Sequence, residues 1–220
     1  VGGVGDINND GELEIAFVDP DRNVKFTDVN GNVSSTGVVL NNPGFISQEV
    51  SDFNGDGYLE IPYAHYKDNI GFVSGGLDSK NKFFDINNNV SDWPGYVKSV
   101  GGIGDILGNG LKEVAVSSYY GYIICVDYDG NFTVLDGNAS VDGDDLRHVG
   151  GFGDLSGDGV KRLFAYSNTY PDGHIFEYYG SGQWEKVKDG AINDYRQSGQ
   201  LGDLGDFTDD GSNEIAFIGG

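Results

Sequence analysis

Short runs of apolar residues, each bounded by polar turn residues, recur along the whole chain. The first cycle contains four such runs, at residues 13–19, 23–29, 33–40 and 44–50. Runs of this length that are rich in β-branched and aromatic residues predict β-strands. No segment has the regular apolar spacing of an amphipathic helix. The pattern therefore predicts an all-β chain in which each cycle contributes four short strands.

Two later segments predict β-hairpins more specifically. Residues 120–128 and 131–137 are apolar runs that flank the tripeptide Asp-Gly-Asn. Such a tripeptide supplies the positive backbone angles that a tight hairpin turn needs. Residues 174–187 predict an equivalent hairpin in the next cycle.

An acidic loop opens every cycle. The loops start at Asp6, Asp52, Asp105, Asp154 and Asp206. The intervals between these residues are 46, 53, 49 and 52 residues. Such periods are typical of propeller blades or solenoid turns, and four strands per period favour propeller blades. We therefore expect one β-propeller domain over residues 1–220, with four complete repeats and the start of a fifth, as part of a larger propeller. The alternative is that the last strand completes a ring by pairing with another part of this chain.

A glycine-rich segment of the form VGGxGD leads into three of the loops. It starts at Val1, Val100 and Val149. Because the chain starts inside this segment and without Met, we expect it to come from a longer precursor.

Loop one (residues 6–14) has the residue types and spacing of a calcium site. Calcium takes six to eight oxygen ligands, and alternate residues of a tightly curled loop can direct their oxygens at one point. The expected ligands are Asp6, Asn8, Asp10, the carbonyl of Glu12, and Glu14. The absence of His and Cys from the loop argues against zinc. The strand exit and the absence of Glu at position 12 argue against an EF-hand.

The other loops repeat this pattern to different degrees. Loop two (residues 52–60) and loop five (residues 206–214) each keep three carboxylates. The expected ligands in loop two are Asp52, Asn54, Asp56, the carbonyl of Tyr58, and Glu60. Those in loop five are Asp206, Thr208, Asp210, the carbonyl of Ser212, and Glu214. Loop three (residues 105–113) has Leu107 at position 3, so we expect weaker binding there, by Asp105, Asn109, the carbonyl of Leu111, and Glu113. Loop four (residues 154–162) offers Asp154, Ser156 and Asp158. Its position 9 is Arg162, whose guanidinium can pair with the aspartates, so we expect no metal in loop four.

The alternative for any one loop is an Asx-turn, because Asp, Asn and Gly favour turns without a metal. Turn formation alone does not need acids at positions 1, 5 and 9 together. The recurrence of that set therefore favours calcium over a purely structural turn.

The five acidic loops, the strands that follow them and their spacing resemble the FG-GAP and VCBS-type repeats of integrin-α-like β-propellers. The resemblance covers nearly the whole chain. It implies a calcium loop between strands in each blade and a propeller that mediates adhesion or ligand recognition. It also implies an extracellular or cell-surface location.

The charge of the chain favours cations as partners. Thirteen Lys and Arg against 35 Asp and Glu give a formal net charge of −22, which repels nucleic acid phosphates and anionic membrane surfaces. A salt-adapted acidic surface is the alternative explanation, and the clustering of the acids in loops argues against it. No apolar stretch approaches the roughly 20 residues of a membrane span. We therefore expect calcium as a partner, no nucleic acid, and no membrane insertion by this segment.

Four Asn-x-Ser/Thr sequons agree with a secreted glycoprotein, and they begin at Asn32, Asn89, Asn131 and Asn138. The single cysteine, Cys125, lies inside an apolar run. That position predicts a buried thiol.

Catalytic motifs do not accompany the histidines. His65, His148 and His174 lie in different cycles without a recurring partner. We expect a binding module for adhesion, ligand recognition or extracellular assembly, with a protein or carbohydrate ligand on a propeller face. The alternative is a calcium-dependent propeller enzyme acting on polysaccharide or phosphate esters. Aromatic stretches such as residues 117–122 could stack on sugars, although packing between the strands of a blade is the favoured interpretation.

Overall fold

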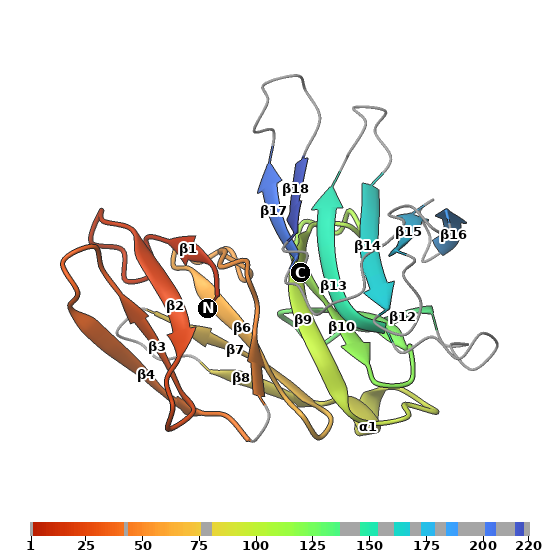
Figure 1. Cartoon of the computed structure of the whole chain (residues 1–220), viewed down its shortest axis with the longest axis horizontal. Helices are drawn as coiled ribbons and strands as arrows, with labels where there is room; N and C mark the ends of the chain where they lie inside the picture. Colours follow the sequence, from red (N-terminus) through yellow and green to blue (C-terminus); the bar gives the residue numbers. More distant parts are fainter. Residues whose placement is uncertain are drawn as a thin grey trace.

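The computed structural model of the chain is all-β and consists of small antiparallel sheets (Figure 1). It describes residues 2–41, 44–75 and 81–136, followed by the strands 146–153, 161–167, 173–178, 184–188, 201–205 and 214–217. In Figure 1 the sheets follow one another from β1–β4 on the left to β13–β16 on the right.

Each of the first four sheets has four strands that are consecutive in the sequence. The first sheet contains β1 (Val4–Gly5), β2 (Glu14–Val18), β3 (Asn23–Thr27) and β4 (Val33–Val39). The second contains β5 (Gly44–Ile46), β6 (Glu60–His65), β7 (Asn69–Ser74) and β8 (Lys82–Asp85). The third contains β9 (Val97–Gly104), β10 (Glu113–Ser118), β11 (Ile123–Asp127) and β12 (Phe132–Asp136). The fourth contains β13 (Leu146–Gly153), β14 (Lys161–Ser167), β15 (Gly173–Tyr178) and β16 (Trp184–Lys188), and a last pair contains β17 (Leu201–Gly205) and β18 (Glu214–Phe217).

This arrangement confirms the predictions of an all-β chain and of the two hairpins. β11 pairs with β12 around Gly130, which has a φ of 83°. β15 pairs with β16 within residues 173–188. One short helix was not predicted, α1 (Ile86–Asn89), because four residues are too few to show a helical period.

The structure corrects where each cycle begins. We expected residues 44–50 to supply the last strand of the first cycle, but β5 pairs with β6, with Phe45 opposite Ala64. In the same way β9 pairs with β10 across loop three. Each of the first three acidic loops therefore connects the first and second strands of one sheet.

Neighbouring sheets bury their apolar faces against each other. Ala16 and Phe26 of the first sheet share a core cluster with Ile61 and Tyr63 of the second sheet. A second cluster joins the second sheet to the third, and a third cluster joins the third sheet to the fourth. Cys125 belongs to the third cluster, as predicted, and burial raises the pKa of its thiol to about 12.

The glycine-rich segment lets the chain segments that lead into the loops of neighbouring sheets approach closely. A Cβ atom on Gly102 would lie 2.6 Å from the Cβ of Glu49, and one on Gly3 would lie 2.5 Å from the carbonyl oxygen of Gln48. The backbone N–H of Gly102 also donates to Oγ of Ser47, at 3.0 Å. The repeated VGG sequence thus has a packing role, because a side chain there would separate the sheets.

We expect Gly102→Ala to lower the free energy of unfolding by about 1–3 kcal/mol, because the added methyl group would overpack the contact between the second and third sheets. Val134→Ala is the matched control, because Val134 is an exposed residue of the same sheet. Chemical denaturation of both variants measures the difference. Equal stability of the two variants would contradict the packing role.

Candidate metal centre

Loop one folds around its own side-chain oxygens. The carboxylate of Asp6 accepts hydrogen bonds from the backbone N–H groups of Asp10, at 2.9 Å, and Gly11, at 3.0 Å. Oδ1 of Asn8 accepts from Asp10 N–H at 2.9 Å, and Oδ1 of Asp10 accepts from Glu12 N–H at 2.9 Å. These bonds curl the loop so that its first, third and fifth side chains lie on the inside.

Glu14 closes the loop from the first position of β2. Its side chain is almost fully buried, and Oε2 accepts a hydrogen bond from the backbone N–H of Ile7 at 2.8 Å. No hydrogen bond from the described part of the chain reaches the other oxygen, Oε1. A buried carboxylate oxygen without a donor costs free energy unless a cation or water compensates it.

Three acidic side chains of loop one come close enough to share one ion. One carboxylate oxygen from each of Asp6, Asp10 and Glu14 lies within 4.8 Å of the other two. Asp10 is exposed and Asp6 is half-buried, so the site opens to solvent on one side. The structure therefore brings together the three acids that the sequence placed at positions 1, 5 and 9.

Loops two and three share the hydrogen-bonded frame of loop one. Glu60 accepts from the N–H of Phe53, and Glu113 accepts from the N–H of Ile106, each at 2.8 Å. The side chains at this second loop position are fully buried in all three loops: Ile7, Phe53 and Ile106. The closing glutamate therefore ties the polar loop to the apolar core.

This structural role of the glutamate was missed in the sequence. The apolar residue that recurs at the second loop position could have indicated this role, because it places one buried N–H group beside each acidic loop and that group needs an acceptor. The closing glutamate is thus both a candidate metal ligand and a constraint on the loop.

Loop two differs from loop one in what surrounds its carboxylates. Nδ2 of Asn54 donates to Oδ2 of Asp56 at 3.1 Å, as Nδ2 of Asn8 does to Asp10 in loop one, but it also donates to Oε1 of Glu60, at 3.0 Å. Burial raises the pKa of Glu60 to about 7, and the negative charges of Asp56 and Asp52 add to this effect. The Asn54 amide nitrogen therefore joins two of the carboxylates that a calcium ion would join, while the amide oxygen accepts from the N–H of Asp56 at 2.7 Å.

Loop three keeps the frame with fewer acids. Asp105 accepts from the N–H groups of Asn109 and Gly110, as Asp6 does in loop one. Burial raises the pKa of Glu113 to about 7, with smaller contributions from Asp105 and Asp127. Since this loop has Leu107 at position 3, the frame forms without an oxygen ligand there.

The remaining expected ligands lie outside the residues that the structure describes: Asp154, Ser156, Asp158, Asp206, Thr208, Asp210 and Ser212. Glu214 begins β18, and Arg162 is a half-buried residue of β14.

Two further observations bear on the other sequence predictions. His65 is buried, and its Nδ1 accepts the backbone N–H of Asn41 at 2.9 Å, which is a structural role. Burial lowers the pKa of His65.

No helix in the described residues is long and apolar enough to cross a membrane.

Comparison with known proteins gives a likeness of fold. No protein-family model matches the chain, and no curated protein matches it. A chain from the crystal structure of BBS1N in complex with ARL6DN, soaked with lead, matches with a TM-score of 0.56 and 11% sequence identity. The match covers 84% of this chain and 51% of that chain, so this chain spans about half the length of the protein it resembles. The likeness supports a propeller-like fold.

We expect Glu113→Ala to lower the free energy of unfolding by about 1–3 kcal/mol in the presence of a chelator. The N–H of Ile106 would keep only the carbonyl of Gly104, at 2.9 Å, and the N–H of Leu107 would lose its bond to the carboxylate. Glu113→Gln keeps an acceptor oxygen and should retain most of the stability. Denaturant unfolding in chelator compares the two variants. Equal loss in both would mean that the carboxylate charge, and not the hydrogen bond, stabilises the loop.

Proposed function

We propose that this chain is a calcium-binding β-propeller module of a secreted or cell-surface protein, and that it acts in ligand recognition, adhesion or extracellular assembly. The main support comes from loop one. Asp6, Asp10 and Glu14 converge there, and a buried oxygen of Glu14 lacks a hydrogen bond from the described residues. A cation at this point would compensate three negative charges held close together.

Calcium suits these residues better than other common metals. The ligand set is all oxygen, which disfavours zinc. Magnesium needs near-ideal octahedral geometry, whereas calcium accepts irregular sets that include a backbone carbonyl and water. The carbonyl of Glu12 and water entering beside the exposed Asp10 would complete such a shell.

The proposed family is that of the FG-GAP and VCBS-type repeats. The support is the acidic loop between the first and second strands of each of three sheets, together with the propeller-like fold. Three of the four sequons, at Asn32, Asn89 and Asn131, lie in exposed positions, as glycosylation of a secreted protein requires. The fourth, at Asn138, lies outside the described residues.

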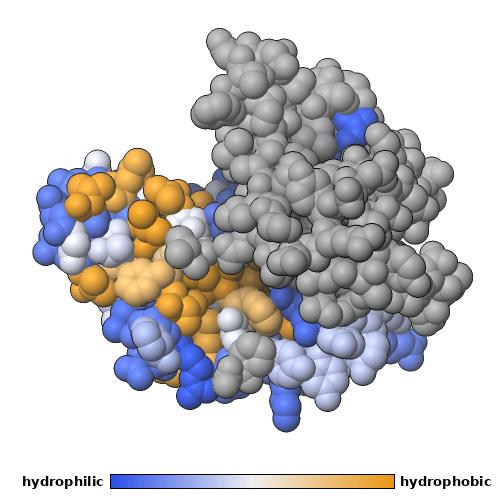
Figure 2. Space-filling model, viewed as in Figure 1, coloured by the Kyte–Doolittle hydropathy of each residue, from blue (hydrophilic) through white to orange (hydrophobic). Residues whose placement is uncertain are grey.

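We propose further that another sheet of the same kind covers the outer face of the first sheet, within a larger propeller. Ile15 is 42% exposed, whereas the residues at the same repeat position in the next three sheets are fully buried: Ile61, Val114 and Leu163. Val4 is 58% exposed, whereas the equivalent Val50 and Ile103 are buried. Figure 2 shows apolar side chains exposed on the side of the molecule that carries β1–β4.

The calcium proposal predicts a specific gain in stability. At a calcium concentration of 100 times the dissociation constant, one site adds about 2.7 kcal/mol to the free energy of unfolding. Asp10→Asn should weaken this gain, because it removes one negative charge from the site. Asp21→Asn is the control, since it removes an exposed charge from the turn between β2 and β3. The effect is measured by calorimetric titration and by melting curves, in both cases with calcium added back after chelation. If calcium neither raised the melting temperature nor gave a heat of binding, the proposal would be refuted.

The open face of the first sheet predicts a contrast between two equivalent positions. Ile15→Lys should change the free energy of unfolding by less than about 0.5 kcal/mol, because the lysine stays in water. Ile61→Lys should destabilise by more than about 3 kcal/mol, because it buries an unpaired charge between two sheets. Denaturation of both variants tests this, and comparable losses would show that the chain itself already covers Ile15.

A further inference from the structure

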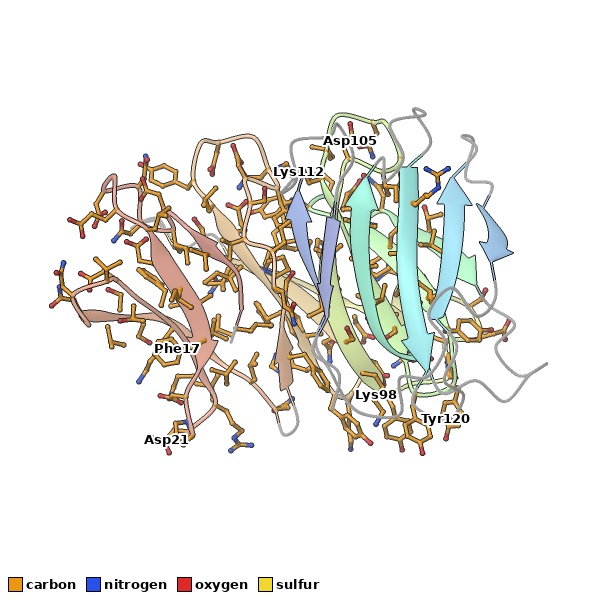
Figure 3. The ribbon with its side chains drawn as sticks, turned by 45° about the horizontal axis from the view of Figure 1, so that its top comes forward. Phe17, Asp21, Lys98, Asp105, Lys112 and Tyr120 are labelled. Atoms are coloured by element: carbon orange, nitrogen blue, oxygen red, sulfur yellow. The ribbon has the colours of Figure 1, made fainter. Side chains whose placement is uncertain are left out.

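Four tyrosines from three different turns meet at one end of the second and third sheets. Tyr66 follows β6, Tyr96 precedes β9, and Tyr119 and Tyr120 lie between β10 and β11. We call these four residues the tyrosine surface. Figure 3 shows Tyr120 and Lys98 at the opposite end of the sheets from Asp105 of loop three.

The rings form a continuous but exposed aromatic surface. Ring centroids are 5.1 Å apart for Tyr66 and Tyr96, 6.4 Å for Tyr96 and Tyr120, and 5.3 Å for Tyr119 and Tyr120. The exposed fractions are 40% for Tyr96, 40% for Tyr119 and 51% for Tyr120. Packing inside a blade would bury these rings, so their exposure favours contact with a ligand.

The backbone beneath the tyrosine surface is strained and firmly held. Tyr96 has a φ of 65°, in the left-handed region that aromatic residues rarely adopt. Oδ1 of Asp68 accepts from Tyr96 N–H and from Nε1 of Trp93, each at 3.0 Å. Tyr119 N–H donates to the carbonyl of Tyr96 at 2.8 Å. Strain of this kind persists where the surroundings enforce it, and it concentrates at ligand-binding positions.

The charges around the tyrosine surface favour a neutral ligand. Nζ of Lys98 lies 4.3 Å from the ring centroid of Tyr119 and 5.8 Å from that of Tyr66. Lys67, next to Tyr66, is exposed. These two cations disfavour a basic peptide, and the net charge of −22 disfavours an acidic polymer.

We propose that the tyrosine surface binds a neutral glycan. The C–H groups on one face of a pyranose ring carry partial positive charge, and they meet the negative face of an aromatic ring favourably. The tyrosine hydroxyls and Lys98 would hydrogen-bond to the sugar hydroxyls at the rim. This inference rests on the proposed role as a binding module and adds the class of ligand.

The test titrates the full chain, with calcium present, with neutral hexasaccharides of glucose, mannose, xylose, galactose and N-acetylglucosamine. Calorimetry and saturation-transfer NMR at about 10 mM sugar detect a dissociation constant of about 1 mM. We expect at least one sugar to bind. Tyr120→Ala should weaken that binding about tenfold or more, and Tyr120→Phe should retain most of it, because the ring remains.

Phe83→Ala is the matched control, because Phe83 is an exposed aromatic residue of β8 outside the tyrosine surface. Its sugar binding should equal that of the unmodified chain. Any of three results would overturn the proposal: none of the sugars binds, Tyr120→Ala binds sugar as well as the unmodified chain, or an arginine-rich peptide binds and no sugar does. Calcium titration of the same samples separates the two proposals: retained calcium binding with no sugar binding overturns only this inference, whereas absent calcium binding overturns the proposed function.

Discussion

The hydrogen bond from the second loop residue to the closing glutamate holds each described acidic loop in place. In loops one, two and three this bond is 2.8 Å long, and both of its partners are buried. The bond links a carboxylate on the second strand to a residue whose side chain lies in the core. A loop rich in mutually repelling acids therefore keeps one conformation, because its far end is anchored in apolar surroundings.

Because of this anchoring, the conformation of the loop does not depend on which residues occupy the ligand positions. Loop three has the same frame as loop one, although Leu107 and Asn109 replace Asn8 and Asp10 at positions 3 and 5. The residues that would contact calcium can therefore change without loss of the fold. That freedom explains how one repeat can carry loops with three or two acids at the ligand positions.

Much of the fold could be predicted from the sequence, because short apolar runs and turn residues are local signals. The strands after each loop and the hairpin at Gly130 agree with those signals. The partner of β5 could not be predicted, because the run at residues 44–50 fits either neighbouring sheet and the pairing is decided across loop two. The three acids of loop one lie close together, as their spacing indicated. The same spacing could not separate a glutamate that binds metal from one that anchors the loop.

The order of strands also fixes which sites can share one end of the molecule. In an antiparallel sheet of consecutive strands, the connection between strands one and two lies at one end, and the turn between strands two and three lies at the other. The first three acidic loops are connections of the first kind, while Tyr66, Tyr119 and Tyr120 lie in turns of the second kind. The six residues of β10 separate the two ends by about 20 Å. A calcium ion bound in one of these acidic loops would therefore not contact a ligand on the tyrosine surface, and it would affect that ligand only by stabilising the strands between them.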